Sequence, residues 1–466
     1  MDSGQASASP GPSVSMISLG CPRTLVDSEL HLGRLVQQGY RVVESAEGAD
    51  VVIINTCAFI QDSIRESIDT VLKALELKRR GRVKAVIVAG CLVQRFKDGL
   101  IAELPEADGF VGVDGFDDID RVVARALAGR PAASLRRRPQ TLRWQEPLTR
   151  EALTPPHYAY LKISEGCLKG CSFCVIPKIK GPLISRPIEA LVDEAKGLVE
   201  RRGVKELIVV GQDTSDYGVD RYGRPRIAEL LSELARIRGL RWIRLLYCHP
   251  AGITEELIET MRGEPAICPY LDTAIEHADD GMLRAMNRPI TQAGLRERLR
   301  ALRAGIPGLT LRTSVIVGFP GETDEAFEGL LGFLREIRFE RLGAFRYSRE
   351  EGSASFRLPD QVPEAAAESR LARLMEQQQV IAAELNAALV GTVCEVLIDE
   401  PCPGEPGLYL GRTQADCPEV DGQVFVRSAG ALSPGAFVPV EITDSYEYDL
   451  VGTALDAALT LQPRGA

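Results

Sequence analysis

The chain has 466 residues, a formal net charge of −10 and a hydrophobic content of 45%. Its length predicts about three domains, and its composition permits large apolar cores. No apolar run approaches the ~20 residues that a membrane-spanning helix needs, and no signal peptide is recognised, so we expect a cytoplasmic protein with no membrane partner. In a reducing cytosol its eleven cysteines would be thiols available to metal ions rather than disulfides.

The amino-terminal part of the chain has the pattern of a doubly wound α/β domain. Residues 1–13 are rich in Ser, Gly, Ala and Pro, and we expect a disordered tail there. Short apolar runs then alternate with amphipathic helical patterns, and such runs indicate buried parallel strands. We place this domain at residues 14–129, with strands at 14–20, 51–57 and 85–91 and helices at 24–38 and 63–79.

Three cysteines of this domain share one topological position. Cys21, Cys57 and Cys91 each stand at the carboxyl end of an expected strand. The carboxyl ends of parallel strands meet at one edge of a sheet, where the sites of α/β proteins gather. The three thiols could therefore converge on one iron–sulfur cluster although they are far apart in sequence. The alternative is that each is a small core residue, which is a common place for a free cysteine.

A linker and a second α/β unit follow. Residues 130–152 lose the periodicity and contain prolines and the basic run Arg136-Arg137-Arg138, so we expect a linker there. From residue 153 to residue 385 strands and helices alternate again. Six such units predict an incomplete TIM-like barrel, whose chemistry would lie at the carboxyl ends of its strands. The expected strands are 158–163, 206–210, 242–247, 270–275, 309–317 and 341–347.

Directly after the first strand of this barrel, Cys167, Cys171 and Cys174 follow one another at Cys-x3-Cys-x2-Cys spacing. Soft thiolates at this density bind iron–sulfur clusters or zinc. Three thiolates leave one iron of a four-iron cube open for an exogenous ligand. No further Cys or His follows within roughly seventy residues to close a structural zinc site. A zinc knuckle or three unrelated core thiols are the alternatives.

The carboxyl-terminal part is acidic and rich in β patterns. Short strands separated by turn residues predict a small five-stranded OB-like barrel at residues 386–456, followed by a tail at 457–466. From Gly391 to Asp456 there are twelve Asp and Glu but only two Arg, so this segment carries a net charge of −10. Nucleic acids are bound through Lys and Arg that neutralise phosphates. We therefore expect a basic protein partner, with nucleic-acid binding not the primary role.

Motifs around the cysteines resemble the methylthiotransferase family of radical S-adenosylmethionine (SAM) enzymes over roughly residues 14–456. The motifs are Gly20-Cys21-Pro22, Asn55-Thr56-Cys57, Gly90-Cys91-Leu92, Ser164-Glu165-Gly166-Cys167 and Gly318-Phe319-Pro320-Gly321-Glu322-Thr323. The resemblance implies two 4Fe–4S clusters, one on each set of three cysteines, with SAM on the open iron of the barrel cluster. It also implies that the carboxyl-terminal barrel is a TRAM domain, and that an electron donor such as flavodoxin or ferredoxin reduces the protein.

The resemblance also assigns SAM contacts to four residues. Gln212 and Asp213 follow a strand at the place where superfamily members meet the SAM amine, and Phe173 matches an aromatic residue that borders the adenine. Arg312 is a charge inside an apolar strand, so it should bind a ligand or form an ion pair. Core packing of Phe173 and a structural ion pair of Arg312 are equal alternatives. No residue is expected to act as a catalytic acid or base.

Three places depart from the family pattern and leave the SAM contacts near them open. Leu168-Lys169-Gly170 stands where Asp-Asn-x is expected, and Ile184 stands where Arg is expected. Glu276-His277 ends a strand where Gln-His is expected. A lone His is more often structural than functional.

Within the family, the sequence is most similar to the branch that modifies ribosomal protein uS12. The resemblance implies that a SAM-derived radical attacks the unactivated β-carbon of an aspartate, that the amino-terminal cluster supplies sulfur, and that a second SAM supplies the methyl group. The branch that modifies adenosine in tRNA is the alternative, which the acidic carboxyl-terminal barrel disfavours. A non-catalytic RNA-binding or iron–sulfur carrier protein is a third interpretation, against which the SAM-type motifs argue.

Overall fold

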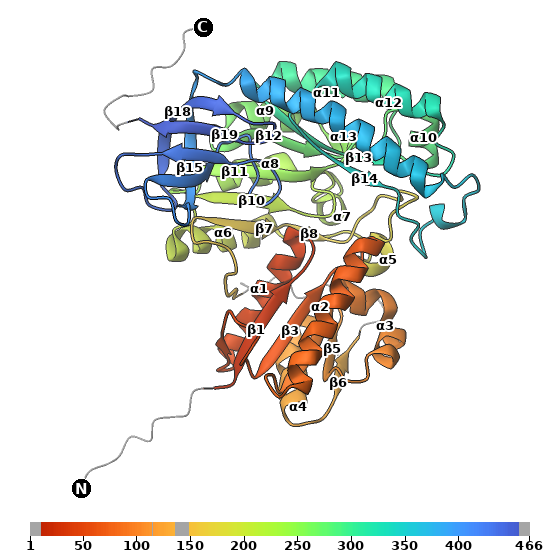
Figure 1. The fold of residues 1–466 in the computed structure, drawn as a ribbon, viewed down its shortest axis with the longest axis vertical. Coiled ribbons are helices and arrows are strands. Elements are labelled where there is room, and N and C mark those ends of the chain that lie inside the picture. The colour runs from red at the N-terminus through yellow and green to blue at the C-terminus, as the bar shows by residue number, and fades with distance from the viewer. Residues whose placement is uncertain (1–10, 114, 136–148, 456–466) are drawn as a thin grey trace.

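A computed structural model of the chain describes residues 11–113, 115–135 and 149–455, and it has three units in the expected order (Figure 1). Two parallel sheets and a closed β-barrel confirm the predicted architecture. Residues 1–10 of the expected amino-terminal tail, the basic run at 136–138 and the tail at 457–466 lie outside the described residues. Among the described residues, no helix is long and apolar enough to cross a membrane.

The amino-terminal domain is a six-stranded, fully parallel sheet in the order β2-β1-β3-β4-β5-β6. Strands β3 and β4 are buried along their whole length, as their continuous apolar runs predict. The edge strand β6 forms in the segment expected as linker, so the sheet extends beyond residue 129. The strands are β1 Ser13–Ser18, β2 Arg41–Val42, β3 Val51–Thr56, β4 Ala85–Gly90, β5 Gly109–Val111 and β6 Ala132–Ser134.

The helices of this domain cover both faces of its sheet. Apolar side chains of α1 and α4 pack on one face, and those of α2 and α3 pack on the other. The chain therefore changes face between the α1 crossover and the α2 crossover, and the strand order reverses at the β1–β3 pair. Such a reversal leaves a crevice beyond the carboxyl ends of the two strands. The helices are α1 Pro22–Gln37, α2 Gln61–Arg79, α3 Cys91–Glu103 and α4 Ile119–Leu127.

The central domain is an open barrel of six parallel strands in the order β14-β13-β12-β11-β10-β7. Helices on its outer face share a large apolar core with it. All six expected strands form, and β12 begins earlier and ends earlier than expected. The strands are β7 Tyr158–Lys162, β10 Glu206–Val210, β11 Trp242–Cys248, β12 Ile267–Thr273, β13 Thr310–Val317 and β14 Arg341–Arg346.

The remaining elements of the central domain surround these strands. A two-stranded hairpin, β8 Ser164–Glu165 with β9 Ile184–Ser185, flanks the loop of the second cysteine set. A long helix, α13, closes the domain and packs Leu374 into the core. The other helices are α5 Ile176–Lys180, α6 Ile188–Arg202, α7 Val219–Tyr222, α8 Ile227–Ala235, α9 Glu255–Gly263, α10 Asp280–Ala285, α11 Gln292–Gly305 and α12 Asp324–Ile337, with α13 at Glu364–Ala387.

The carboxyl-terminal unit is a closed barrel in the order β15-β16-β17-β19-β18, which confirms the expected five-stranded barrel. Alternate apolar side chains of its strands fill the interior. The strands are β15 Val393–Pro401, β16 Leu408–Arg412, β17 Val424–Arg427, β18 Phe437–Ser445 and β19 Leu450–Ala454.

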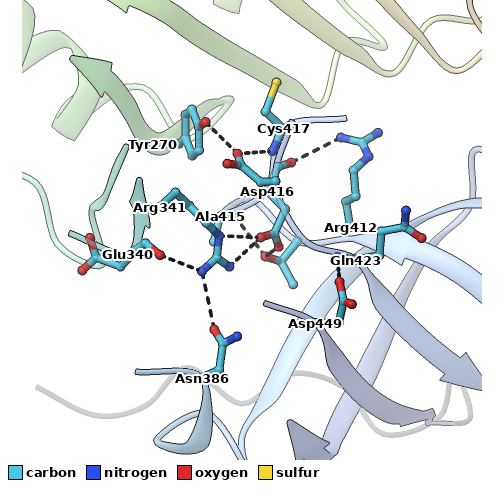
Figure 2. Close-up of polar contacts among 12 residues, drawn as sticks. Tyr270, Glu340, Arg341, Asn386, Arg412, Ala415, Asp416, Cys417, Gln423 and Asp449 are labelled. Atoms are coloured by element: carbon cyan, nitrogen blue, oxygen red, sulfur yellow. Dashed lines mark hydrogen bonds and ion pairs between the residues drawn. The ribbon is translucent and has the colours of Figure 1, made fainter. Parts of the chain in front are cut away.

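This barrel docks on the amino-terminal ends of the central strands, and the loop after β16 makes the contact (Figure 2). Arg341, the first residue of β14, pairs with Asp416 at 2.6 Å. The Tyr270 hydroxyl donates to Asp421 at 2.7 Å. All four side chains are largely buried. Buried charges are retained only when paired, so these contacts fix the barrel to the central domain.

A second set of contacts extends this interface. Glu206, the first residue of β10, is fully buried between two guanidinium groups: Arg244 at 2.8 Å and Arg412 at 2.6 Å. Beside them the rings of Trp242 and Phe437 meet edge to face with centroids 4.9 Å apart. Charge and apolar area together make this interface part of the molecule's interior.

The acidic character of the carboxyl-terminal barrel is therefore only partly available to a partner. Asp399, Asp416 and Asp421 are engaged with Arg412, Arg341 and Arg312, respectively. The expectation that the charge of this unit as a whole serves partner binding is thus wrong for these three residues. Any binding of a basic partner by this unit is left to its exposed acidic side chains, which include Glu400, Glu405, Glu441 and Asp444.

Candidate functional site

Two sets of three cysteines lie at the carboxyl ends of the strands of the first two domains. We call Cys21, Cys57 and Cys91 the amino-terminal triad, and Cys167, Cys171 and Cys174 the barrel triad. All six are free thiols.

The barrel triad lies on one loop after β8, and the end of α10 holds that loop in place. The Ser172 amide donates to the Met286 carbonyl at 3.0 Å, and the Ser172 hydroxyl donates to the Ala285 carbonyl at 2.7 Å. The Asn287 side chain donates to the Gly170 carbonyl at 2.7 Å. These contacts come from a part of the chain more than a hundred residues away, so the thiol spacing is visible in the sequence but its support is not.

The amino-terminal triad is assembled by the fold. Cys21 follows β1, Cys57 follows β3 and Cys91 follows β4, so two of the thiols flank the point where the strand order reverses. Gly20 allows the close approach, because a Cβ there would lie 3.1 Å from the Cys57 sulfur. Gly20 also has a φ of +95°, which favours glycine.

The motif residues before Cys57 join the three strand ends. The Asn55 side chain donates to the Thr24 carbonyl at 3.1 Å, at the start of α1. The Thr56 hydroxyl donates to the Ala89 carbonyl at 2.5 Å and accepts from the Leu92 amide at 3.3 Å, at the start of α3. Asn55 and Thr56 are thus positioning residues for the triad, a role that a motif match alone does not reveal.

The thiols differ in their electrostatic surroundings. Burial raises the pKa of Cys167 to about 11 and that of Cys174 to about 12, and it raises the pKa of Cys91 to about 12. Burial opposes ionisation of Cys21 too, but the charge and hydrogen bond of the adjacent Arg23 outweigh it and lower the pKa to about 7. Most of these thiols would need a metal to ionise, since a coordinated thiol loses its proton outright.

Neither triad is arranged as a site for one metal ion. Among the described residues, no three Cys, His, Asp or Glu side chains are gathered closely enough to hold a single ion. A four-iron cube binds each thiolate through a different iron, so it requires convergence without such tight contact. A donor set of three thiols on each side suits iron–sulfur clusters.

The structure places the four expected SAM-contact residues in different settings. Gln212 lies after β10, where its amide donates to Glu165 at 2.5 Å. Asp213 accepts from the Ser215 hydroxyl at 2.6 Å and is nearly buried. Phe173 packs with an apolar cluster that contains Met286 and Phe319. Lys169, on the loop of the barrel triad, lies 3.6 Å from Asp213. The loop after β10 is therefore close to the barrel triad.

Arg312 is held by ion pairs. Its Nη1 lies 2.9 Å from Asp272 of the neighbouring strand, and its Nε lies 3.4 Å from Asp421 of the carboxyl-terminal barrel. This arrangement matches the structural alternative for Arg312, because both nearby carboxylates already balance its charge. Glu276 has a φ of +65° and lies 4.0 Å from Arg288, whereas His277 is fully buried and paired with Glu322.

Several buried polar atoms near the barrel triad lack partners within the described part of the chain. They are Gln212 Oε1, His249 Nε2 and Arg288 Nε. Burial and the nearby Arg288 and Lys169 lower the pKa of His249 to about 2, so its ring is neutral. Unpaired buried polar groups are costly and indicate a missing partner. SAM, with its amine, carboxylate and ribose, offers groups that fit these atoms. His249 and Arg288 have no motif signal in the sequence.

A buried charge cluster lies where α1 meets the central domain. Lys162 contacts both Asp27, at 2.5 Å, and Glu165. Lys180 lies 3.2 Å from Asp27 and 3.4 Å from Glu165. Burial opposes ionisation of both carboxyl groups, but the two ammonium groups lower their pKa values. The cluster joins the two domains between their triads, and sequence reasoning missed it because its members are distant in the chain.

The chain matches known families along most of its length. The family models for the radical SAM superfamily, an uncharacterized family termed UPF0004 and the TRAM domain match residues 161–334, 13–112 and 390–455, respectively. The superfamily uses SAM and a 4Fe–4S cluster, and these matches confirm the expected TRAM domain. In overall fold the chain is similar to the radical SAM methyltransferase TsrM from Kitasatospora setae, with a TM-score of 0.56 at 14% identity over 86% of this chain and 80% of that one.

Two curated relatives are more similar in sequence. The ribosomal protein uS12 methylthiotransferase RimO of Clostridioides difficile is 44% identical over 95% of this chain and 98% of that protein. The RimO protein of Pelotomaculum thermopropionicum is 46% identical over 95% of this chain and 99% of its own. With this identity over nearly the full length, the chain belongs to the ribosomal protein uS12 methylthiotransferase family RimO, a family of radical SAM enzymes.

Proposed function

We propose that this enzyme attaches a methylthio group to the β-carbon of an aspartate of ribosomal protein uS12, using SAM and two 4Fe–4S clusters. The observation that carries the proposal is the pair of thiol triads, one at the carboxyl ends of three parallel strands and one on the loop after β8, joined by a buried interface. The names of the curated relatives supply the substrate.

Each triad would hold one cluster. Cys167, Cys171 and Cys174 would bind the cluster that leaves an iron open for SAM, and the amino-terminal triad would bind the second. When bound, SAM and the barrel cluster supply a 5′-deoxyadenosyl radical, which can abstract hydrogen from an unactivated carbon. The protein's part is to orient and to shield. Gln212 and Asp213 would meet the SAM amine, and the unpaired atoms of His249 and Arg288 extend this set.

Arg312 and Phe173 complete the predicted set of SAM contacts. Arg312 would have to leave one of its two carboxylate partners or share its guanidinium, since it has five donors and uses few of them here. Phe173 would border the adenine while packing on its apolar cluster.

The partner would be a basic protein. Exposed acidic side chains on the TRAM barrel, among them Glu405, Glu441 and Asp444, offer charge complementarity to uS12, and only Arg427 is an exposed base there. We expect the enzyme to act in the cytoplasm and to receive electrons from a flavodoxin- or ferredoxin-type donor.

Mass spectrometry of uS12 and of total tRNA, from cells with and without this gene, tests the proposal. We expect one aspartate of uS12 to carry the mass of a methylthio group only when the gene is present, and tRNA to be unchanged. A methylthio group that appears on tRNA adenosine instead would establish the alternative substrate.

A further inference from the structure

Arg23, two residues after Cys21, reaches from the amino-terminal domain into the central barrel. Its Nε donates to the Cys21 sulfur at 3.3 Å, and its Nη1 donates to the Gly211 carbonyl at 3.1 Å. Gly211 directly precedes Gln212 and Asp213. One guanidinium therefore joins a thiol of the amino-terminal triad to the loop that is expected to bind SAM.

The same guanidinium lies over the ring of Tyr247, 4.6 Å from its centroid. Tyr247 stands near the carboxyl end of β11 and has a φ of +60°, a left-handed conformation that is costly for a residue with a side chain. Its neighbours impose this conformation. The Tyr247 amide donates to Asp272 at 3.2 Å, and its carbonyl accepts from the Thr214 amide at 2.9 Å.

Strain of this kind persists where surrounding contacts over-determine the backbone, and such places are often functional. Here the strained residue presents an aromatic face to a cation from another domain, and such a contact is attractive. Thr214 belongs to the same loop as Gly211. Arg23 therefore contacts that loop at Gly211, and Tyr247 contacts it at Thr214.

We propose that Arg23 and Tyr247 form a clamp that positions the amino-terminal triad over the SAM-binding loop, so that sulfur donor and radical source address the same substrate carbon. Both are positioning residues, and neither needs to touch the substrate. The activity test of the clamp rests on the proposed function. Positioning matters steeply in such a reaction, because a misplacement of ~1 Å can cost ~100-fold in rate.

A role of Arg23 as a charge partner of Cys21 alone would make a different prediction. In that case the ring of Tyr247 would be dispensable, since Tyr247 would contribute nothing to the thiol that Arg23 touches. Variants of Tyr247 therefore separate a clamp from a local charge effect.

The first experiment measures 5′-deoxyadenosine formed per methylthiolated uS12 in reconstituted full-length enzyme. For the clamp-breaking variants Arg23→Met and Tyr247→Leu we expect SAM cleavage to continue while this ratio rises at least ~10-fold. The matched variant Tyr247→Phe keeps the ring, so its ratio should stay within ~3-fold of wild type. Parallel loss of both products, or an unchanged ratio in Tyr247→Leu, would overturn the clamp.

The second experiment needs no turnover. Hydrogen–deuterium exchange of the full-length reconstituted protein, without SAM, should be faster at residues 20–26 and 211–215 in both clamp-breaking variants, and equal to wild type in Tyr247→Phe. Unchanged exchange in the clamp-breaking variants contradicts the proposal. If wild-type enzyme does not methylthiolate uS12, the proposed function fails and exchange alone decides the clamp. If Arg23→Met loses iron, Tyr247→Leu decides, because it removes only the ring.

Discussion

The TRAM domain and the amino-terminal domain pack on opposite ends of the central barrel, and the two interfaces differ in the kind of contact they contain. At the amino ends of the strands, the TRAM domain is held by paired charges such as Arg341 with Asp416 and by aromatic packing. At the carboxyl ends, the amino-terminal domain contributes Arg23 over a strained Tyr247, near buried polar atoms that have no partner in the described part of the chain. Barrel enzymes place stability at the first end and chemistry at the second.

This difference teaches how to sort buried polar groups. The arginines at the TRAM interface, Arg244, Arg341 and Arg412, are paired with carboxylates, so removal of those partners should cost stability. At the other end the charge cluster around Lys162 is paired, whereas Gln212 Oε1, His249 Nε2 and Arg288 Nε have no partner among the described residues, which is what a site awaiting a ligand requires. Each prediction below acts on one end and leaves the other as its control.

The largest effect is expected from the barrel triad. Replacing Cys167, Cys171 and Cys174 together with Ala should remove about half of roughly eight irons per chain and abolish SAM cleavage, because no thiolates remain for that cluster. Iron analysis after anaerobic reconstitution and assay of 5′-deoxyadenosine check this. A protein that holds zinc and no iron would contradict it.

The amino-terminal triad should behave differently. Replacing Cys21, Cys57 and Cys91 with Ala should also remove about half of the iron, but SAM cleavage should continue, because the barrel ligands lie in another domain. Methylthiolation should cease. The assay compares 5′-deoxyadenosine with modified uS12 in one reaction. Full transfer by this variant would show that these thiols have a structural role only.

The sequence predicted the strands and both triads because those signals are local. Continuous apolar runs such as Val51–Thr56 indicate buried parallel strands, and a cysteine at the end of each run marks the sheet edge. The contacts that orient the thiols depend on distant residues. Asn55 touches Thr24, and Ser172 touches Ala285, and neither pairing has a periodicity or spacing that a single sequence displays.

Charge in the sequence was the poorest predictor of which residues contact a ligand or a partner. The acidic composition of the TRAM segment predicts a basic partner, yet Asp416 and Asp421 face arginine and tyrosine side chains of the central domain. Arg312 was expected to meet SAM, and its ion pairs with Asp272 and Asp421 give it a structural role as well. Composition counts charges, whereas burial decides which of them reach a partner.

At the TRAM end, Asp416→Ala should destabilise the protein without stopping SAM cleavage. It leaves Arg341 buried and without its carboxylate, and breaking such a pair costs about 3–5 kcal/mol. Thermal unfolding and limited proteolysis of the TRAM domain measure the effect. The matched control is Asp444→Ala at an exposed position, which should change stability by no more than ~0.5 kcal/mol.

The exposed face of the same domain should govern partner binding only modestly. Changing Glu405, Glu441 and Asp444 to Lys should weaken binding of uS12 a few-fold at low salt, because exposed charges are screened over a Debye length of ~10 Å at 0.1 M. Arg427→Glu on the same barrel is the opposite control and should strengthen binding. Binding that is tighter to tRNA than to uS12 in the wild-type protein would contradict this assignment.

A pH-dependent effect on stability is expected at the other end, at His31 on α1. Burial, together with Lys180 and Lys162, outweighs Asp27 and lowers the pKa of His31 to about 4 from 6.5. The folded protein thus keeps the ring neutral while the unfolded chain binds a proton below pH 6.5. The contribution of His31 is fully present above that pH and is lost as pH falls toward 4.

At pH 5.5, one unit below the unfolded value, this linkage should lower the free energy of unfolding by about 1.4 kcal/mol relative to pH 7.5. In His31→Gln the side chain does not titrate, so urea unfolding of this variant should lose about that much less stability between the two pH values. The iron content of this variant should match that of wild type, because no hydrogen bond among the described residues joins His31 to either triad. Identical pH slopes in the two proteins would show that His31 is not held neutral, and would leave the acid sensitivity of this interface to the charge cluster around Lys162.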